Sequence, residues 1–373
     1  MLNIDRRLFK NFDWATFSII VFLSIMGIMT IYSATRPLLP NEQANYHIKQ
    51  IYWLIVGIAA LFIVVNFDYV WLNRFAYPLY VIGMLLLLAV LFAGKTGMGA
   101  QRWLNIGPFS FQPSEIFRPI FTIALARYLT TIHNRMNLAT MIKTFLMFAV
   151  IPLILLIKQP DLSTAIILLI MFLTLCIAKG LQKRVIALLI LLGIISIPFL
   201  GNILWEGLKD YQKNRLVAFM KPDADPAGIG YHINQSKVAI GSGEFMGKGY
   251  MKGTQGPFRF LPEKHTDFIF AVFAEEWGFL GSFLLMLVYL AFILRGIDTA
   301  LKAKDEFGKL LAAGITFMFS AYFFINTGMT LGIMPVVGIP LPFMSYGGTA
   351  LLSNFIAAGL LINIRTRRFE LFY

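Results

Sequence analysis

The sequence has only one cysteine, Cys176, which lies inside an apolar run. A single cysteine excludes an intrachain disulfide and indicates no redox compartment, so we interpret it as a small packing residue. Charge is also scarce, because charged residues make up 14% of the 373 residues, whereas a soluble domain carries about 25%. Hydrophobic residues make up 58%. This excess does not fit into a water-soluble core, so lipid is the expected solvent for much of the chain.

Several functional motifs are absent as well. The glycine-rich segment 241–256 matches neither a P-loop nor a dinucleotide-binding fingerprint, because no strand is expected before it and it lacks Gly-Lys-Ser/Thr. His232 and His265 are too few and too far apart to indicate a metal site. The net charge of +13 does not indicate nucleic-acid binding, since no basic run is interleaved with aromatics. No internal repeat supports an inverted-repeat transporter.

The sequence does contain ten apolar segments, each close to the roughly 20 residues that cross a bilayer as a helix. We expect spans at 14–34, 51–67, 74–93, 114–131, 142–157, 162–179, 184–204, 267–294, 309–332 and 347–364. The first span follows three basic residues, but it is too long for the apolar part of a signal peptide, so we expect it to be retained. The prediction is an all-α integral membrane protein of about ten transmembrane helices, built as one polytopic domain over 1–373.

Lysine and arginine are unevenly distributed between alternate connections. With the N-terminus inside, the short outer segments hold only Arg36, Lys49, Lys95, Arg102, Arg118 and Lys158. Cytoplasmic connections carry the excess of basic residues in membrane proteins, so we expect both termini in the cytoplasm. The polar segments 94–113, 158–161 and 333–346 then lie outside, together with one large extracellular loop of about 205–266 between helices 7 and 8.

The segment 333–348 is unusual because proline and glycine crowd around Ser345 and Tyr346. A regular helix is excluded there. Broken backbone at membrane depth is tolerated only when it is buried in protein or lines a watery cavity, so we expect a cavity near the outer surface. Several other side chains near that surface are interface anchors, packing groups or pocket residues, and the sequence does not separate these roles: Tyr46, Gln50, Trp103 and Asn326.

Asp267 is the most prominent ionisable residue at a predicted membrane surface, because an apolar run follows it immediately. Partial desolvation there would raise the pKa of the carboxyl toward the range of a general base. The alternative is a helix N-cap. Thr266 can serve as the cap, so Asp267 is not needed for it. Both interpretations stay open on spacing alone.

Glu275 and Glu276 lie two turns further along the same predicted helix, deeper in the membrane. Glu275 lies close to the face of Asp267, and Glu276 is rotated by about 100° from Glu275. A buried pair of carboxylates needs partners. We favour a structural role, in which they bond to neighbouring helices, over direct catalysis.

Cationic and polar side chains of the outer segments are candidates for binding an anionic substrate. Arg102 and Arg118 present planar forks of donors that suit phosphate oxygens, with Gln112 and Glu115 between them. Glu115 and Arg118 are three apart on one helix face, so an ion pair between them is the simpler interpretation, compatible with a diphosphate clamp. The glycine-rich segment adds Lys248 and Lys252, in a basic loop that could fold over a long polar substrate.

Together these segments strongly resemble the SEDS family (shape, elongation, division and sporulation), and the resemblance runs from the first span to the last. The matching motifs are Gln101–Trp103, Phe111–Glu115, Lys158–Asp161, Tyr231–Gly243, Gly253–Gln255, Phe260–Val272 and Met334–Gly348. Within the family, Tyr231–Lys237 and Gly253–Gln255 are similar to the elongation branch (RodA) rather than the division branch.

The resemblance implies a peptidoglycan glycosyltransferase of ten helices that polymerises lipid II on the outer face of the bacterial inner membrane. It places the essential aspartate of the family at Asp267 and favours catalysis there, with Asp161 and His265 in supporting positions. Arg102 and Arg118 are candidates for the diphosphate, although family members commonly carry lysine where this chain has Arg118. Ser345 and Tyr346 fall in another family motif and are candidate substrate contacts.

The resemblance also implies partners. These are a class B penicillin-binding protein, whose transpeptidase crosslinks the new strands, other proteins of the elongation complex, lipid II and the glycan linked to undecaprenyl diphosphate. A divalent cation, Mg²⁺ or Mn²⁺, would suit the diphosphate, but no ligand cluster in the sequence requires one.

Two other functions would suit many of the same features. A lipid II flippase or other transporter would also need many helices, a cavity and intramembrane charge, but in this chain the polar residues gather on the outer side. A non-catalytic scaffold that positions the crosslinking enzyme is the third hypothesis.

Overall fold

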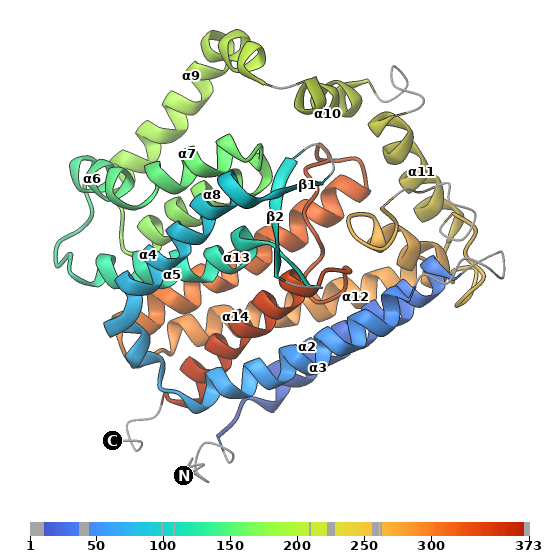
Figure 1. Ribbon diagram of the computed structural model, residues 1–373, viewed down its shortest axis with the longest axis horizontal. Coiled ribbons are helices and arrows are strands. Elements are labelled where there is room, and N and C mark those ends of the chain that lie inside the picture. The colour runs from blue at the N-terminus through green and yellow to red at the C-terminus, as the bar shows by residue number, and fades with distance from the viewer. Residues whose placement is uncertain are drawn as a thin grey trace.

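The computed structural model describes residues 11–36, 45–97, 100–106, 109–208, 210–221, 228–255, 261 and 263–368. The chain is mostly helical, with long helices packed side by side (Figure 1). The helices are α2 (Trp14–Thr35), α3 (Tyr46–Asn66), α4 (Tyr69–Ala93), α5 (Pro113–Thr130), α6 (Leu138–Phe148), α7 (Val150–Lys158), α8 (Leu162–Ala178), α9 (Lys183–Gly207), α10 (Asp210–Met220), α11 (Ile229–Ser242), α12 (Ile269–Leu301), α13 (Glu306–Thr330) and α14 (Gly348–Thr366).

Each predicted span coincides with helical structure. Six helices in the described part of the chain are long and apolar enough to cross a membrane: α2, α3, α4, α12, α13 and α14. The expected span at 142–157 is a pair, α6 and α7, bent by 47°. Pro152 explains the break, because it cannot donate to the carbonyl of Phe148, four residues earlier. If this pair is counted as one span, the described part of the chain has seven candidate spans. Helix α8 is also apolar but shorter. The protein is therefore a multi-pass membrane protein.

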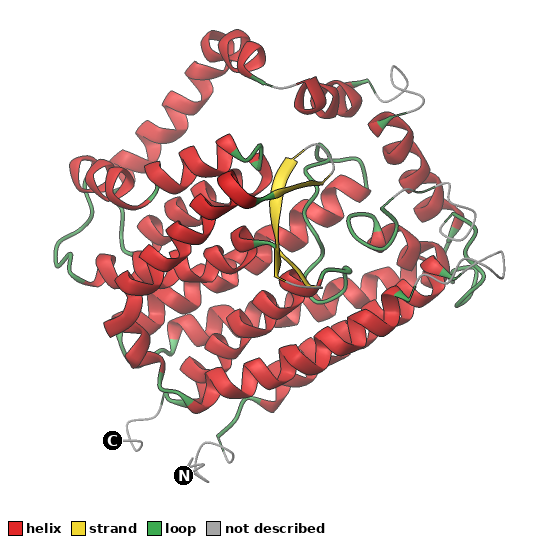
Figure 2. Ribbon diagram, in the orientation of Figure 1, coloured by secondary structure: helices red, strands yellow, loops and turns green. Residues whose placement is uncertain are grey.

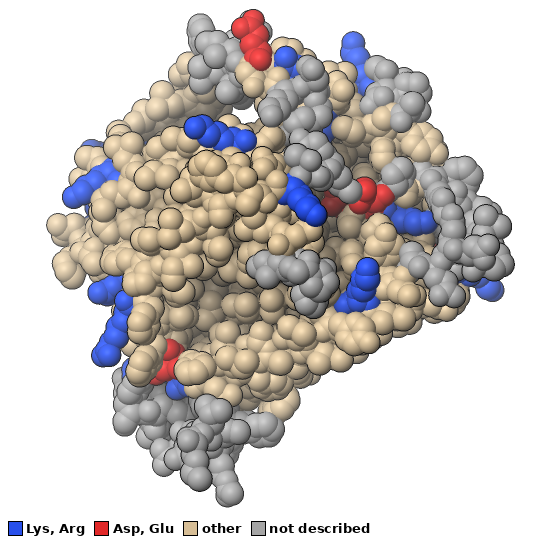
Figure 3. Space-filling view, in the orientation of Figure 1, with Lys and Arg blue, Asp and Glu red and all other residues tan. Residues whose placement is uncertain are grey.

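The outer surface of the helices is apolar, as lipid contact requires. Side chains such as Phe92 of α4, Ile190 of α9 and Tyr52 of α3 are 83%, 59% and 66% exposed. Broad uncharged areas separate the charged groups on the face shown in Figure 3. In water such a surface would be strongly unfavourable, at roughly 25 cal/mol for each Å² of exposed apolar area. The composition and the structure thus both indicate that lipid surrounds these helices.

The beginning of α2 and the end of α14 are joined by ion pairs at one end of the helix bundle. Asp13, just before α2, forms ion pairs with Arg295 of α12 and with Arg365 of α14, the latter at 3.3 Å. Arg365 also bonds to Asp298 at 2.7 Å. The beginning of α2 and the end of α14 therefore lie on the same side.

The segment between α13 and α14 is broken backbone, as expected from its prolines and glycines, and its part 341–345 is buried in protein. Phe343 packs against Phe319 and Phe355, with ring centroids 5.3 and 5.6 Å apart. The Tyr289 hydroxyl of α12 donates to the Pro342 carbonyl at 2.6 Å. This packing holds Phe343 at a φ of 65°, a left-handed conformation that is rare for an aromatic residue.

A small antiparallel sheet occupies the first predicted outer segment (Figure 2), and we did not expect strands there. It consists of β1 (Lys95–Gly97), β2 (Ala100–Ile106) and β3 (Phe109–Phe111), in the order β1-β2-β3. Leu104 pairs with Phe111, and Lys95 pairs with Trp103. The strands are too short for a periodic pattern to reveal them, and they place Arg102 in the middle of β2.

The predicted loop 205–266 contains two helices, α10 and α11, which follow α9 around the periphery of the bundle (Figure 1). The glycine-rich segment after α11 inserts at an interruption of α12, where Gly278 has a φ of 65°. Lys248 N–H donates to the Glu275 carbonyl at 3.0 Å, and Phe279 N–H donates to the Glu244 carbonyl at 2.8 Å. The loop thereby satisfies backbone groups that an unbroken helix would pair internally.

Candidate active site

Asp267 lies in the turn just before α12, and it does not cap that helix. The cap position is Phe268. Thr266, which could have served as the cap, does not do so, because its hydroxyl donates to the Glu263 carboxylate at 2.8 Å. A turn of 263–268 precedes the helix, and this turn shifts the first helical residue beyond the polar pair. The N-cap alternative for Asp267 is therefore removed.

Gly338 lies beside both the Asp267 carboxylate and a guanidinium group. A Cβ atom added at Gly338 would lie 3.2 Å from Asp267 Oδ2 and 3.7 Å from Nη1 and Nη2 of Arg215. Arg215 belongs to α10, and its Nη1 donates to the Val337 carbonyl at 2.8 Å. Gly338 has a φ of 75°, which favours glycine. The missing side chain leaves space next to both the carboxylate and the guanidinium.

The charges around Asp267 oppose one another. Burial, together with the nearby Glu263 carboxylate, raises the pKa of Asp267 to about 6, although Arg215 and Arg102 act to lower it. At pH 7 the carboxyl is therefore mostly ionised, yet its basicity exceeds that of an ordinary aspartate. A carboxylate with these properties can accept a proton near neutral pH.

The broken segment before α14 is tied directly to the turn that carries Asp267. Asn326 Nδ2 donates to the carbonyls of Asp267 and Ile339 at 2.9 and 2.7 Å. The Ser345 hydroxyl donates to the Thr266 carbonyl at 2.7 Å and accepts from Leu341 N–H at 2.8 Å. Asn326 and Ser345 are thus positioning residues that fix the backbone around the carboxylate.

Three rings extend this network toward α3. Tyr46 stacks on His265 with centroids 4.5 Å apart, and Tyr346 lies 5.0 Å from Tyr46. Tyr346 N–H donates to the His265 carbonyl at 2.8 Å. Gln50 donates to the Ser345 carbonyl at 3.0 Å. Tyr46 and Gln50, to which the sequence assigned no single role, thus form one cluster with His265 and Tyr346 near Asp267.

Arg102 connects the small sheet to the turn before α8. Its Nη2 donates to the Pro160 carbonyl at 2.6 Å, and its Nη1 lies 3.6 Å from Asp161 Oδ1. Asp161 caps α8 by accepting from Thr164 N–H, and it also accepts from the Ser114 hydroxyl. Gln112 continues the chain of contacts to Ser114 at 3.1 Å. Arg102 keeps 19% of its side chain exposed, so a substrate can still reach it.

Arg118 is less accessible than Arg102. The expected ion pair with Glu115 is confirmed, and the guanidinium carbon lies 4.5 Å from the centroid of the Tyr322 ring. The Arg118 and Glu115 side chains are only 4% and 9% exposed. A role for this pair at a diphosphate stays a prediction, and the buried Arg118 Nε makes no hydrogen bond within the described residues.

Glu275 and Glu276 are buried and bonded to neighbouring segments. Glu275 accepts from Lys248 Nζ at 2.7 Å and from both the N–H and the hydroxyl of Thr254 at 2.8 Å. Glu276 accepts from the Ser33 hydroxyl of α2. These contacts fit a structural role. The Lys248 ammonium is engaged with Glu275, whereas Lys252 is exposed.

Arg215 is the residue that sequence analysis missed. It lies in the predicted outer loop between Lys213 and Lys221, and nothing in the sequence separates it from them. Only the packing of α10 against the broken segment reveals its place beside Asp267. Metal binding gains no support, because within the described ranges no three His, Cys, Asp or Glu side chains come together.

Comparison with known proteins agrees with the motifs. A model of a cell cycle protein family, comprising FtsW, RodA and SpoVE, matches residues 12–370. The chain is 42% identical to the peptidoglycan glycosyltransferase MrdB of Escherichia coli K12 over 293 residues, which cover 78% of this chain and 77% of that protein. It is 31% identical to the peptidoglycan glycosyltransferase RodA of Treponema pallidum, with 96% of this chain and 98% of that protein covered.

Solved structures share the fold. One is a chain in a structure that describes how a peptidoglycan synthase complex coordinates polymerization and crosslinking. The TM-score is 0.81 at 28% identity, and the match covers 96% of this chain and 99% of that chain. Another is Thermus thermophilus rod shape determining protein RodA, with a TM-score of 0.70, 26% identity and coverage of 96% and 98%.

Proposed function

Since the chain belongs to the FtsW, RodA and SpoVE family of cell cycle proteins, we propose that it is a peptidoglycan glycosyltransferase that polymerises lipid II during cell elongation. The observation that carries the proposal is the juxtaposition of Asp267 and Arg215 beside Gly338, with Arg102 contributing to the same field. Sugar transfer from a diphosphate carrier uses a base to accept the proton of the acceptor and cations to stabilise the leaving diphosphate.

The reaction lies on the outer face of the bacterial inner membrane. The chain crosses that membrane ten times, with both termini in the cytoplasm and the segment 205–266 outside. The excess of lysine and arginine in the connections on the side of the termini supports this orientation. The ion pairs of Asp13 with Arg295 and Arg365 also support it, because they hold the start of α2 and the end of α14 on one side.

Asp267 acts as the general base. Its carboxylate accepts the proton of the 4-hydroxyl of the acceptor sugar, and that oxygen forms a bond with the anomeric carbon of the lipid-linked donor. The bond between this carbon and the diphosphate oxygen breaks, and the electron pair leaves with undecaprenyl diphosphate. A pKa of about 6 keeps the base ionised at pH 7 without making it too weak to accept the proton.

Arg102 and Arg215 stabilise the charge that develops on the leaving diphosphate. Each guanidinium already donates to a backbone carbonyl, of Pro160 or Val337. A guanidinium presents five N–H donors in a planar fork, a geometry that suits phosphate oxygens. Arg118 then supports the site from beneath through Glu115. Mg²⁺ or Mn²⁺ at the diphosphate stays a prediction, and no step of the transfer depends on it.

The partner is a class B penicillin-binding protein that crosslinks the strands, with other elongation proteins around it. The structural likeness to a chain of a peptidoglycan synthase complex supports this assignment.

The test uses the purified full chain, with and without its class B partner, and labelled lipid II in detergent. We expect glycan polymer from the wild type and none from Asp267→Asn. No polymer from the wild type with its partner, or equal polymer from the variant, would overturn the proposal. Movement of lipid II across the liposome membrane with no polymer formed would identify a flippase. If crosslinking by the partner depends on this chain although the chain makes no polymer, the chain is a scaffold.

A further inference from the structure

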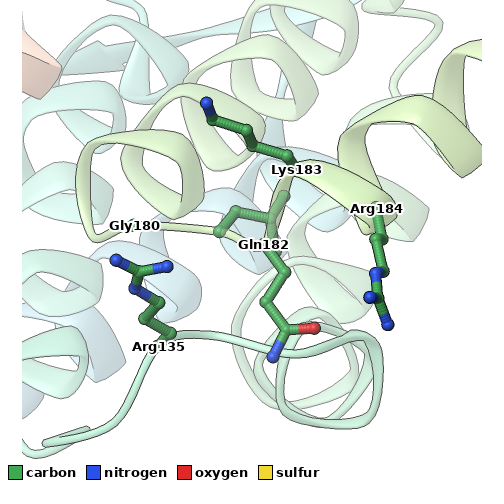
Figure 4. Close-up of a pocket in the computed structure, with 6 residues that line it drawn as sticks. Arg135, Gly180, Gln182, Lys183 and Arg184 are labelled. Atoms are coloured by element: carbon green, nitrogen blue, oxygen red, sulfur yellow. The ribbon is translucent and has the colours of Figure 1, made fainter.

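A concave region lies far from Asp267, where the connection between α5 and α6 meets the turn between α8 and α9 (Figure 4). It is a cavity of about 580 Å³ lined by Arg135, Gly180, Leu181, Gln182, Lys183 and Arg184. Three of these six residues are cationic and none is acidic. The region has no part in the proposed polymerisation.

Backbone contacts build the cavity. The α8 helix ends in a Schellman motif, in which Gly180 N–H donates to the Ile177 carbonyl and Leu181 N–H donates to the Cys176 carbonyl. Gly180 has a φ of 98°, and no atom lies within 4 Å of a Cβ built on it. Gln182 N–H then donates to the Met136 carbonyl at 3.0 Å, so the two connections are held together. The hollow is a fixed feature of the backbone.

Ion pairing places the cavity at the opposite end of the bundle from Asp267. Lys179, next to Gly180, bonds to Glu306 at 2.5 Å. Glu306 begins α13 just after α12 ends, whereas Asp267 lies before α12 begins. With Asp267 at the outer face, the cavity lies at the cytoplasmic surface of the membrane.

The electrostatics of the cavity favour an anion. Figure 4 shows Arg135 and Arg184 on either side of Gln182, with Lys183 extending in another direction. The 25-residue helix α9 begins at this point, and its cap residue Gln182 makes no side-chain cap hydrogen bond among the described residues. The first turn of α9 therefore adds the positive end of its dipole and N–H donors to the charges of the arginines.

The surroundings of the cavity indicate that the anion belongs to a lipid. Exposed apolar side chains continue away from it along three helices, with Ile177 on α8, Ile142 on α6 and Leu188 on α9. A soluble phosphate compound would leave these side chains unused. Acyl chains would cover them, and the phosphate would remain at the arginines.

We propose that this cavity binds the headgroup of an anionic phospholipid of the cytoplasmic leaflet, with Arg135 and Arg184 contacting the phosphate. The acyl chains lie against the exposed apolar faces of α6, α8 and α9. The site would hold the α8–α9 connection, and with it the start of the helix that leads to the outer loop, at a defined depth in the membrane.

The test compares binding of fluorescent phosphatidylglycerol and phosphatidylcholine to the full-length protein in detergent. We expect phosphatidylglycerol to bind preferentially, and the double substitution R135Q/R184Q to weaken it by about fivefold for each arginine removed. The matched control is Lys143→Gln, an exposed cation on α6 outside the cavity, which should change binding less than about twofold, because it adds no charge to the site. R135K/R184K keeps the charges and should restore most of the binding.

Equal binding of both lipids, an equal effect of Lys143→Gln, or no restoration by R135K/R184K would overturn the proposal. Displacement of the lipid by millimolar inorganic phosphate would show a site for soluble anions instead. Polymerisation of lipid II in detergent by R135Q/R184Q should match the wild type, because the cavity lies at the far end of the bundle. This readout also shows that the variant is folded, and it separates failure of this proposal from failure of the proposed polymerase function.

Discussion

Two carboxylates near the start of α12 have opposite surroundings. Glu275 is fully buried, and Lys248, Thr254 and the Gln255 N–H donate hydrogen bonds to its oxygens. Asp267 faces Arg215 and Arg102, but these guanidinium groups also donate to the carbonyls of Val337 and Pro160. A carboxylate held by a lysine, a hydroxyl and backbone N–H groups is suited to hold structure, whereas one with a raised pKa near two guanidinium groups can exchange a proton.

The largest expected effect is on Asp267. Asp267→Asn keeps the shape of the side chain and removes the base, so polymerisation should fall by about 10³-fold. Gel analysis of polymer from labelled lipid II measures the loss, with Glu206→Gln, an exposed acid at the end of α9, as the matched control. An Asp267→Asn enzyme with activity within about tenfold of the wild type would contradict the assignment of the base.

Arg215 should come next. Arg215→Gln removes charge from the leaving diphosphate and should lower the rate roughly 10²-fold, the usual cost of losing one preorganised donor. Because Arg215 lowers the pKa of Asp267, its loss should also raise that pKa and move the acid limb of the pH profile to higher pH. A profile that does not move would show that the two residues are not coupled. Lys213→Gln on the same helix is the control.

The contrast predicts that Glu275 acts on stability. Glu275→Gln leaves Lys248 without its buried counter-charge and should lower the free energy of unfolding by about 2 kcal/mol, since Lys248 is partly exposed and retains some hydration. Thermal unfolding in detergent measures this change. Lys248→Met and the double variant complete a cycle in which the two losses should not add. A stable Glu275→Gln protein that is inactive would assign Glu275 to catalysis instead.

The pH dependence should be the smallest effect. With a pKa raised to about 6, the rate should fall about tenfold for each pH unit below that value as the base is protonated. The effect on stability has the opposite sign. The folded state holds the proton more tightly than the unfolded chain does, so this group favours folding at low pH, and its contribution declines as the pH rises through about 4 to 6. A rate independent of pH between about 5 and 7 would contradict the role of Asp267.

The sequence alone predicted the features that follow from a local pattern of residues, such as an apolar run or a fixed helical spacing. Apolar runs near Ile20, Leu87 and Ile315 predict helices, because lipid imposes one length and one composition on every span. The Glu115–Arg118 pair was predictable for a similar reason, since a spacing of three brings side chains together on any helix. Asp267 stood out because a charge beside an apolar run is costly.

Tertiary structure decided the features that depend on residues distant in the sequence. Arg215 approaches Asp267 beside Gly338, and Lys248 pairs with Glu275. Each of these contacts joins segments whose separation in the sequence carries no periodic signal. The physical reason is that spans arise from local hydrophobicity, which each segment carries by itself. A site arises from the directions in which a few side chains point once several segments have packed, and no single segment contains that information.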